Sequence, residues 1–259
     1  MQLLFPDSPH TLAPEGGLTL PHSIGTIRDG MNTDNQPDGR SRSRGGLSAF
    51  SLSVSLAFLL VGCSRSSSDE PLRVTTLQAA MAAPDQVEEL DLYYRRLSSF
   101  PPEILRLRNL KRLTLRTCRI GELPITIASL TGLTALDMGE TSLTNLTPGV
   151  GSLTNLSRLW LNDNALASLP GELGSLQRLE YLNCDRNQLS RLPEQTGSLR
   201  ALKWLRLNGN QLQALPEDLS GLAQNLETLY LLGNPIPEEE RSRIKKALPN
   251  CAIYFEGAK

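Results

Sequence analysis

The chain has 259 residues, and its 26 Lys and Arg against 27 Asp and Glu give a net charge of −1, which indicates neither a nucleic acid nor any other highly charged partner. Its four cysteines do not suggest a disulfide framework. Both histidines, His10 and His22, lie in a segment that we expect to be absent from the mature chain. The rest would then lack Ser-His and Cys-His nucleophile pairs and histidine metal sites, so we expect no enzyme, metal or cofactor.

Residues 1–39 are rich in Pro, Gly, Asp and Asn without a sustained period, and we expect a disordered segment or a misassigned start. Residues 40–62 differ. Three arginines precede a mostly apolar run over 47–61, and a small residue, Gly62, ends the segment. This order predicts a secretory signal peptide, and the run is short for a permanent membrane span. Translation from Met31 would give a leader of ordinary length; a long leader from Met1 is the alternative.

The sequence Leu60-Val61-Gly62-Cys63 resembles the lipobox of bacterial lipoproteins. The resemblance implies cleavage before Cys63 and attachment of lipid, including fatty-acyl chains such as palmitate, to that residue. Residues 63–71 would then form a lipid-anchored tether. Ser64 after the cysteine implies the outer membrane if the host is a diderm bacterium. A buried apolar helix that ends in a chance cysteine is the alternative interpretation.

Residues 72–86 are predicted to form an N-terminal cap. A helix is expected from Leu72 to Ala83, because Leu77, Ala80 and Met81 share one helical face and Pro84 stops the pattern. Thr75 or Thr76 would cap its first turn.

Residues 87–236 contain one pattern seven times, with a period of 23 residues and a last step of 24. Such a period with this leucine spacing is the signature of leucine-rich repeats. The predicted fold is an α/β solenoid, a horseshoe of seven repeats with a parallel sheet on its concave face and helical caps at both ends. The phrase Leu-Pro-x-x-(Ile/Leu)-Gly-x-Leu, as in 169–176, resembles the 23-residue subclass of bacterial proteins and Ras-pathway scaffolds, which implies a non-catalytic protein-binding scaffold.

Each repeat opens with Leu-x-x-Leu-x-Leu, whose last two apolar residues lie two apart and face one side of a strand. These pairs, such as Leu159 with Leu161 and Leu182 with Cys184, are expected to form a continuous core. An asparagine ladder at the ninth position is expected to bond the backbone of adjacent turns: Asn164, Asn187, Asn210 and Asn234. Cys118 and Thr141 fit the same position in earlier repeats. Arg95 does not, which predicts an irregular or open first turn.

The return half of most repeats carries a Leu-Pro pair followed by apolar residues that suit a short helical turn on the outer side. The third repeat has Leu146-Thr147 instead. Residues 237–259 are predicted to form a C-terminal cap, with a helix that begins at Pro237 and ends before Pro249, and an edge strand over 252–255.

Strand residues that alternate with the core leucines face the concave side. The second half of this face carries aromatic and arginine side chains, which are enriched at binding hot spots. The candidate partner site comprises Arg158, Trp160, Tyr181, Trp204, Arg206 and Tyr230. The four rings are expected to form one exposed group, so that replacing Trp160 and Trp204 by Ala would abolish partner capture with little effect on unfolding. Ring stacking that merely stabilises the sheet is the alternative.

The sequence thus predicts a monomeric scaffold, lipid-anchored at the bacterial envelope, that binds a protein or a glycan. A cytoplasmic scaffold of the Ras-related type is the alternative if the leader is unused. Cys118 and Cys184 lie three repeats apart, about 14 Å by strand spacing, so both are predicted to be free thiols.

Overall fold

The computed structural model describes residues 71–256. The predicted start segment, the signal peptide, Cys63 and all but the last residue of the tether lie outside this range. Among residues 71–256, no helix combines the length and the apolar character needed to cross a bilayer.

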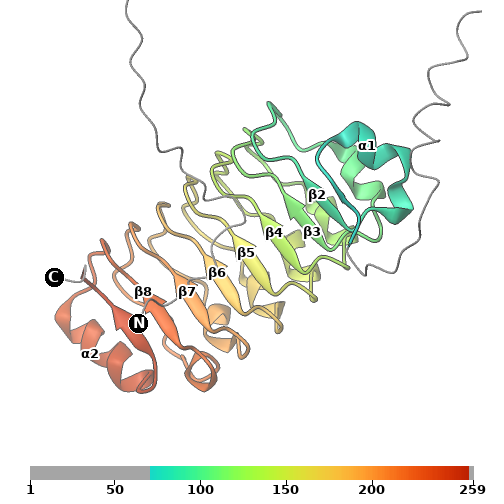
Figure 1. Ribbon diagram of the computed structural model, residues 1–259. Coiled ribbons are helices and arrows are strands. Elements are labelled where there is room, and N and C mark those ends of the chain that lie inside the picture. Colours follow the sequence, from blue (N-terminus) through green and yellow to red (C-terminus); the bar gives the residue numbers. More distant parts are fainter. Residues whose placement is uncertain (1–70, 257–259) are drawn as a thin grey trace, which may run out of the picture. The chain divides into compact units, whose positions relative to one another are not determined.

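Nine parallel strands form one open sheet in sequence order (Figure 1). The seven strands of the repeats pair in register, so that Leu90, Leu113 and Leu136 are direct neighbours. A shift of 23 residues relates each of these strands to the next, except for 24 between the last two, as the sequence period predicts. The strands are β1 (Arg73–Val74), β2 (Glu89–Asp91), β3 (Arg112–Thr114), β4 (Ala135–Asp137), β5 (Arg158–Trp160), β6 (Tyr181–Asn183), β7 (Trp204–Arg206), β8 (Thr228–Tyr230) and β9 (Ala252–Tyr254).

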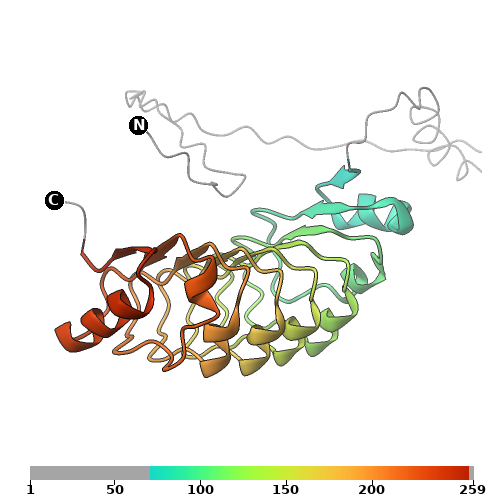
Figure 2. The same ribbon diagram turned by 90° about the horizontal axis from the view of Figure 1, so that it is seen from below.

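Short 3-10 helices lie on the side of the solenoid opposite the strands (Figure 2). Proline in an extended conformation precedes four of the five repeat turns, and in the third repeat Thr147 caps the turn by accepting a hydrogen bond from the Gly149 amide. The predicted outer helical turns are confirmed. The 3-10 helices are η1 (Pro84–Gln86), η2 (Pro102–Arg106), η3 (Ile125–Ser129), η4 (Pro148–Ser152), η5 (Gly171–Ser175), η6 (Glu194–Ser198) and η7 (Leu222–Gln224).

The N-terminal cap differs from the prediction. Its helix, α1 (Leu77–Ala82), begins five residues later than expected, with the Thr76 hydroxyl accepting a hydrogen bond from the Ala79 amide at 3.1 Å. Arg73 and Val74 instead form β1 and pair with β2. Pairing with β1 satisfies the backbone hydrogen-bonding groups at the exposed edge of β2, and this pairing outweighs the helical pattern of residues 72–76. The six residues of α1 still place the predicted apolar face on one side of the helix.

The C-terminal cap consists of α2 (Glu238–Ala247) followed by β9, which pairs with β8. Pro237 occupies the N-cap position, so the helix begins one residue later than the sequence suggested. Ile244 and Leu248 are buried against the last repeats.

The leucine pairs of all seven strands are buried in one continuous core, including Met138 and Cys184 where they replace leucine. No single repeat encloses its own leucines, so burial depends on stacking. Cys118 and Cys184 are both buried free thiols, as predicted.

The asparagine ladder also forms as predicted. Asn187 donates from Nδ2 to the carbonyls of Leu161, at 2.9 Å, and Cys184, at 3.1 Å, while its Oδ1 accepts from the Leu166 amide at 3.1 Å. Asn164, Asn210 and Asn234 make corresponding bonds. These amides satisfy backbone groups that the sharp turn out of each strand leaves unpaired.

Candidate functional site

The strand face is the surface formed by the side chains that alternate with the core leucines. Its register sets two rows across the sheet. The first row runs Glu89, Arg112, Ala135, Arg158, Tyr181, Trp204, Thr228 and Ala252. The second row runs Asp91, Thr114, Asp137, Trp160, Asn183, Arg206, Tyr230 and Tyr254. Candidate residues therefore come from both rows.

Most guanidinium groups of the strand face and of the turns that follow it are paired with a carboxylate of a neighbouring repeat. Arg206 contacts Asp185 at 2.8 Å, and only 1% of the Asp185 side chain is exposed. Burial opposes the charge of Arg206, but Asp185 outweighs this effect and raises the pKa of Arg206. The other pairs are Arg73 with Asp91, Arg112 with Glu89, Arg116 with Glu140, and Arg186 with Asp163.

Arg158 is an exception, because it is exposed and has no carboxylate partner among residues 71–256. Its guanidinium carbon lies 5.9 Å from the centroid of the Trp160 ring, close enough for a cation–π interaction. The charge of Arg158 is thus available to a partner on this face.

The prediction that both tryptophans are exposed is wrong for Trp160. Its side chain lies on the strand face, but only 5% of the residue is exposed, and Tyr181 is 7% exposed. The two ring centroids lie 5.4 Å apart at an interplanar angle of 43°, and Ala135 and Trp204 pack against them. Large rings on strands a few ångströms apart cover each other, and this burial raises the pKa of Tyr181. Trp204 remains half-buried.

The four rings also divide into two groups instead of one. Tyr230 stacks on Tyr254, with centroids 5.0 Å apart and planes at 12°, and the guanidinium of Arg206 lies 5.0 Å from the Tyr230 ring. We call Trp204, Arg206, Tyr230 and Tyr254 the C-terminal strip. Tyr254 is 39% exposed and was missed by the sequence analysis. Alignment of the final strand with Thr228–Tyr230 would have placed it in the second row.

The described residues contain no group of three or more His, Cys, Asp or Glu side chains arranged to hold a metal ion. The strand face presents aromatic rings and arginine side chains that contact one another.

Comparison with known proteins identifies the fold. Models of leucine-rich repeats match residues 154–196, as two copies, and residues 201–222. The fold is a leucine-rich repeat solenoid. The predicted fold class is thereby confirmed. No protein of the curated set matches the chain.

Several solved leucine-rich repeat structures are similar. A leucine-rich repeat protein of Leptospira interrogans is 30% identical with a TM-score of 0.51; the match covers 70% of this chain but only 57% of that protein. Internalin C2 of Listeria monocytogenes is 24% identical with a TM-score of 0.58. The match covers 73% of this chain and 78% of the internalin chain, and at this identity it shows the fold alone. A plant peptide hormone receptor in complex with RGF2 has 26% identity and a TM-score of 0.57, over 66% of this chain and 28% of the receptor.

Proposed function

We propose that this protein is a non-catalytic scaffold that binds a protein partner on the strand face, chiefly through the C-terminal strip. The observation that carries the proposal is the setting of Arg206. Its guanidinium is fixed by buried Asp185 and lies over Tyr230, which itself stacks on the exposed ring of Tyr254. Such prearranged arginine and aromatic groups lose little entropy on binding and are typical of hot spots.

The plant receptor supports a protein or peptide as the ligand class, because its structure holds a leucine-rich repeat receptor with RGF2 bound. Arg158, a strand-face cation without a carboxylate partner among residues 71–256, would extend the contact toward the middle of the face, and an acidic group of the partner would complement it. A glycan is the competing ligand class, and protease treatment of the captured material separates a protein ligand from a glycan.

We further propose that the protein is bacterial and that Cys63 anchors it by lipid to the cell envelope. The lipobox-like segment before Cys63 and the similarity to a Leptospira protein support this location. Mass spectrometry of the mature protein tests it. Diacylglycerol on an N-terminal Cys63 is the expected result, whereas an intact leader in soluble extract would favour the cytoplasmic alternative.

Capture from the envelope fraction of the native host tests the binding face. The double variant Trp204→Ala/Tyr230→Ala is expected to lose the captured partner. The control Ile125→Ala/Arg191→Ala removes an exposed apolar and an exposed cationic side chain outside the strand face and is expected to retain it. Capture that survives in both variants would place the partner elsewhere. Protease treatment of the captured material distinguishes a protein from a glycan.

A further inference from the structure

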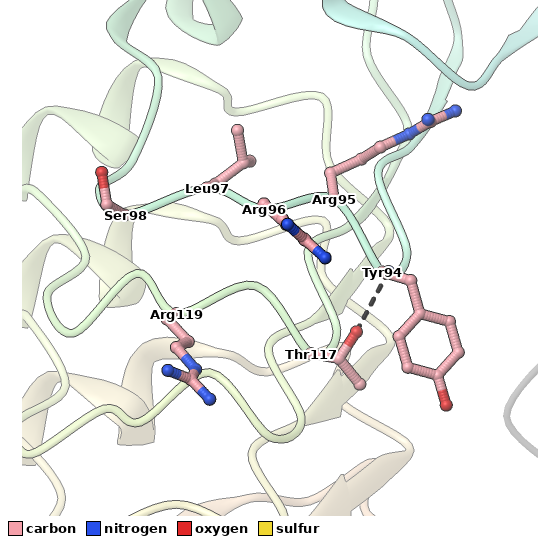
Figure 3. A pocket seen from close by; sticks show the side chains of 7 residues that line it. All are labelled: Tyr94, Arg95, Arg96, Leu97, Ser98, Thr117 and Arg119. Carbon is pink, nitrogen blue, oxygen red and sulfur yellow. Dashed lines mark hydrogen bonds between the residues drawn. The ribbon is translucent and has the colours of Figure 1, made fainter. Parts of the chain in front are cut away.

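A pocket of about 610 Å³ opens between the turns of the first two repeats, at the N-terminal end of the solenoid (Figure 3). It lies beside the strand face but outside the candidate partner site. Its lining residues are Tyr94, Arg95, Arg96, Leu97, Ser98, Thr117 and Arg119.

The pocket opens where the asparagine ladder is missing. In later repeats a ladder amide binds the turn before it, as when Asn187 accepts from the Leu166 amide, and the Gln188 amide donates to the Leu166 carbonyl at 2.9 Å. Cys118 replaces the asparagine between the first two turns. Its thiol donates to the Leu92 carbonyl at 3.2 Å, and the backbone amides of Arg95 and Leu97 lie close enough to it to oppose the rise in its pKa that burial causes. A thiol sulfur is a much weaker hydrogen-bond acceptor than the asparagine oxygen that it replaces.

Two backbone groups show the consequence. The Leu97 amide, which corresponds to that of Leu166, donates within its own turn to the Arg95 carbonyl at 2.8 Å. The Arg119 amide, which corresponds to that of Gln188, donates to no backbone carbonyl in the described part of the chain. The two turns are joined by the Tyr94 amide, which donates to the Thr117 hydroxyl at 3.0 Å, but the ladder bonds are missing and the space beyond this contact stays open.

The open space is cationic. Arg96 and Arg119 are exposed and come from adjacent turns, and neither has a carboxylate partner within residues 71–256. Arg95 is directed away from them in Figure 3 and donates to the Thr75 carbonyl at 3.0 Å. No Asp or Glu lines the pocket. This contrasts with the strand face, where neighbouring carboxylates pair with most guanidinium groups.

We propose that this pocket binds a phosphate or sulfate group, with Arg96 and Arg119 as its principal charge partners. Guanidinium groups bind such oxyanions with two parallel N–H···O bonds, and two arginines on separate turns can contact an anion from two sides. The Arg119 amide is a further donor without a backbone acceptor. Tyr94, which is 70% exposed, offers a ring surface to whatever organic group carries the anion.

Two sources of this group share the chemistry: a phosphorylated or sulfated molecule in solution, and the headgroup of an anionic lipid. Titration calorimetry of the full chain with inorganic phosphate and with sulfate probes the first. Flotation with phosphatidylcholine vesicles, with and without phosphatidylglycerol, probes the second. Binding to either probe supports the pocket and identifies the source, whereas binding to neither overturns the proposal.

Matched variants separate the pocket from general positive charge. Arg96→Ala/Arg119→Ala is expected to weaken binding by about tenfold or more, because charge-assisted bonds are lost. Arg191→Ala/Arg200→Ala removes the same charge from exposed positions elsewhere and is expected to bind like the unaltered protein. Equal losses in the two pairs, or no loss in the first, would contradict a specific site. Thermal unfolding of each variant checks that the fold is intact.

Cys118→Asn tests why the pocket is open while leaving every arginine in place. The new amide is expected to bind the Leu97 amide, add a further link between the two turns, raise the melting temperature and weaken phosphate binding. Unchanged binding in this variant would contradict the inference that the missing ladder bonds open the site.

Discussion

The side-chain amide of Asn187 donates a hydrogen bond to the carbonyl of Leu161, 26 residues earlier in the chain, at a distance of 2.9 Å. The bond joins the turn of one repeat to the residue that follows strand β5 of the repeat before it. Because Asn187 also binds its own turn through Cys184 and the preceding turn through Leu166, one side chain serves three backbone segments. Repeats that touch only their neighbours depend on such links for cooperative folding.

Replacing Asn187 by Ala should therefore be costly. The change leaves the buried Leu166 amide without its acceptor, whereas the carbonyls of Leu161 and Cys184 keep hydrogen bonds from Asn164 and Asn210. An unpaired buried group costs about 1–3 kcal/mol, so a loss of about 1–3 kcal/mol is expected. Urea denaturation measures it. Gln177→Ala removes an exposed amide and should change stability by less than about 0.5 kcal/mol. Similar small effects for both variants would show that water replaces the ladder.

Some glycines of the outer turns lie where a neighbouring turn leaves no room for a side chain. A Cβ added at Gly197 would lie 1.8 Å from the Asp218 carbonyl oxygen, whereas one added at Gly132 would come no closer than 3.4 Å to any backbone atom of a neighbouring turn. Gly197→Ala should destabilise the protein by more than about 2 kcal/mol, because adjacent turns must separate. Gly132→Ala should be tolerated. Melting temperatures of the two variants provide the comparison, and equal values would contradict the close approach of these turns.

The sequence predicts the repeat core and the ladder well, because both follow from local spacing. An apolar residue two positions from another faces the same side of any strand, and a 23-residue period keeps equivalent residues adjacent, so Leu159 and Leu182 pair as expected. The Arg95 turn was also expected to be irregular, and Arg95 is indeed exposed.

The N-terminal strand and the packing of the strand-face rings depend on contacts between segments, which the spacing of residues in one segment does not reveal. Arg73 and Val74 form a strand only because β2 offers an unpaired edge, which a single-segment helical pattern cannot reveal. The burial of Trp160 arises from ring packing with Tyr181, and the same period-2 pattern would accommodate exposed rings equally well. The pairing of Tyr230 with Tyr254 required the register of the cap strand.

The three described cysteines should differ in reactivity. Burial raises the pKa of Cys184 and of Cys118, and raises that of half-buried Cys251 to about 11. Because the thiolate is the reactive form, maleimide at pH 7 should label Cys251 slowly and leave the other two unmodified until the protein is denatured. Peptide mass spectrometry locates the label. Rapid native labelling of Cys184 would contradict its place in the core.

Stability should fall in acid through two carboxyl groups. Burial would raise the pKa of Asp163, but hydrogen bonds from Arg186 and Asn162 outweigh it and lower that pKa below its usual 3.8. The hydrogen bond from Arg243 is the main cause that lowers the pKa of Glu240 below 4.5. A carboxyl with a lowered folded-state pKa stabilises the fold above its unfolded pKa and loses that contribution as pH falls through the folded value.

Urea unfolding should therefore show nearly constant stability from pH 8 to 5, because the described residues contain no histidine, and a decline below about pH 4.5. The double variant Asp163→Asn/Glu240→Gln should be less stable at pH 7 and should decline less steeply in acid. Parallel acid profiles for the two proteins would show that other carboxyl groups control the transition.

The two tryptophans should respond differently to truncation. Trp160 is 5% exposed and packs on Tyr181 and Ala135, so Trp160→Ala removes a buried ring and should cost about 3 kcal/mol or more. Trp204 is half-buried, so Trp204→Ala should cost about 1 kcal/mol and act mainly on partner capture. This corrects the expectation that a double substitution leaves unfolding nearly unchanged. Thermal unfolding of the single variants, with Trp160→Phe as a control that keeps a ring, decides the point. If Trp160→Ala melts within a degree of the unaltered protein, the ring is not part of the packing of the strand face.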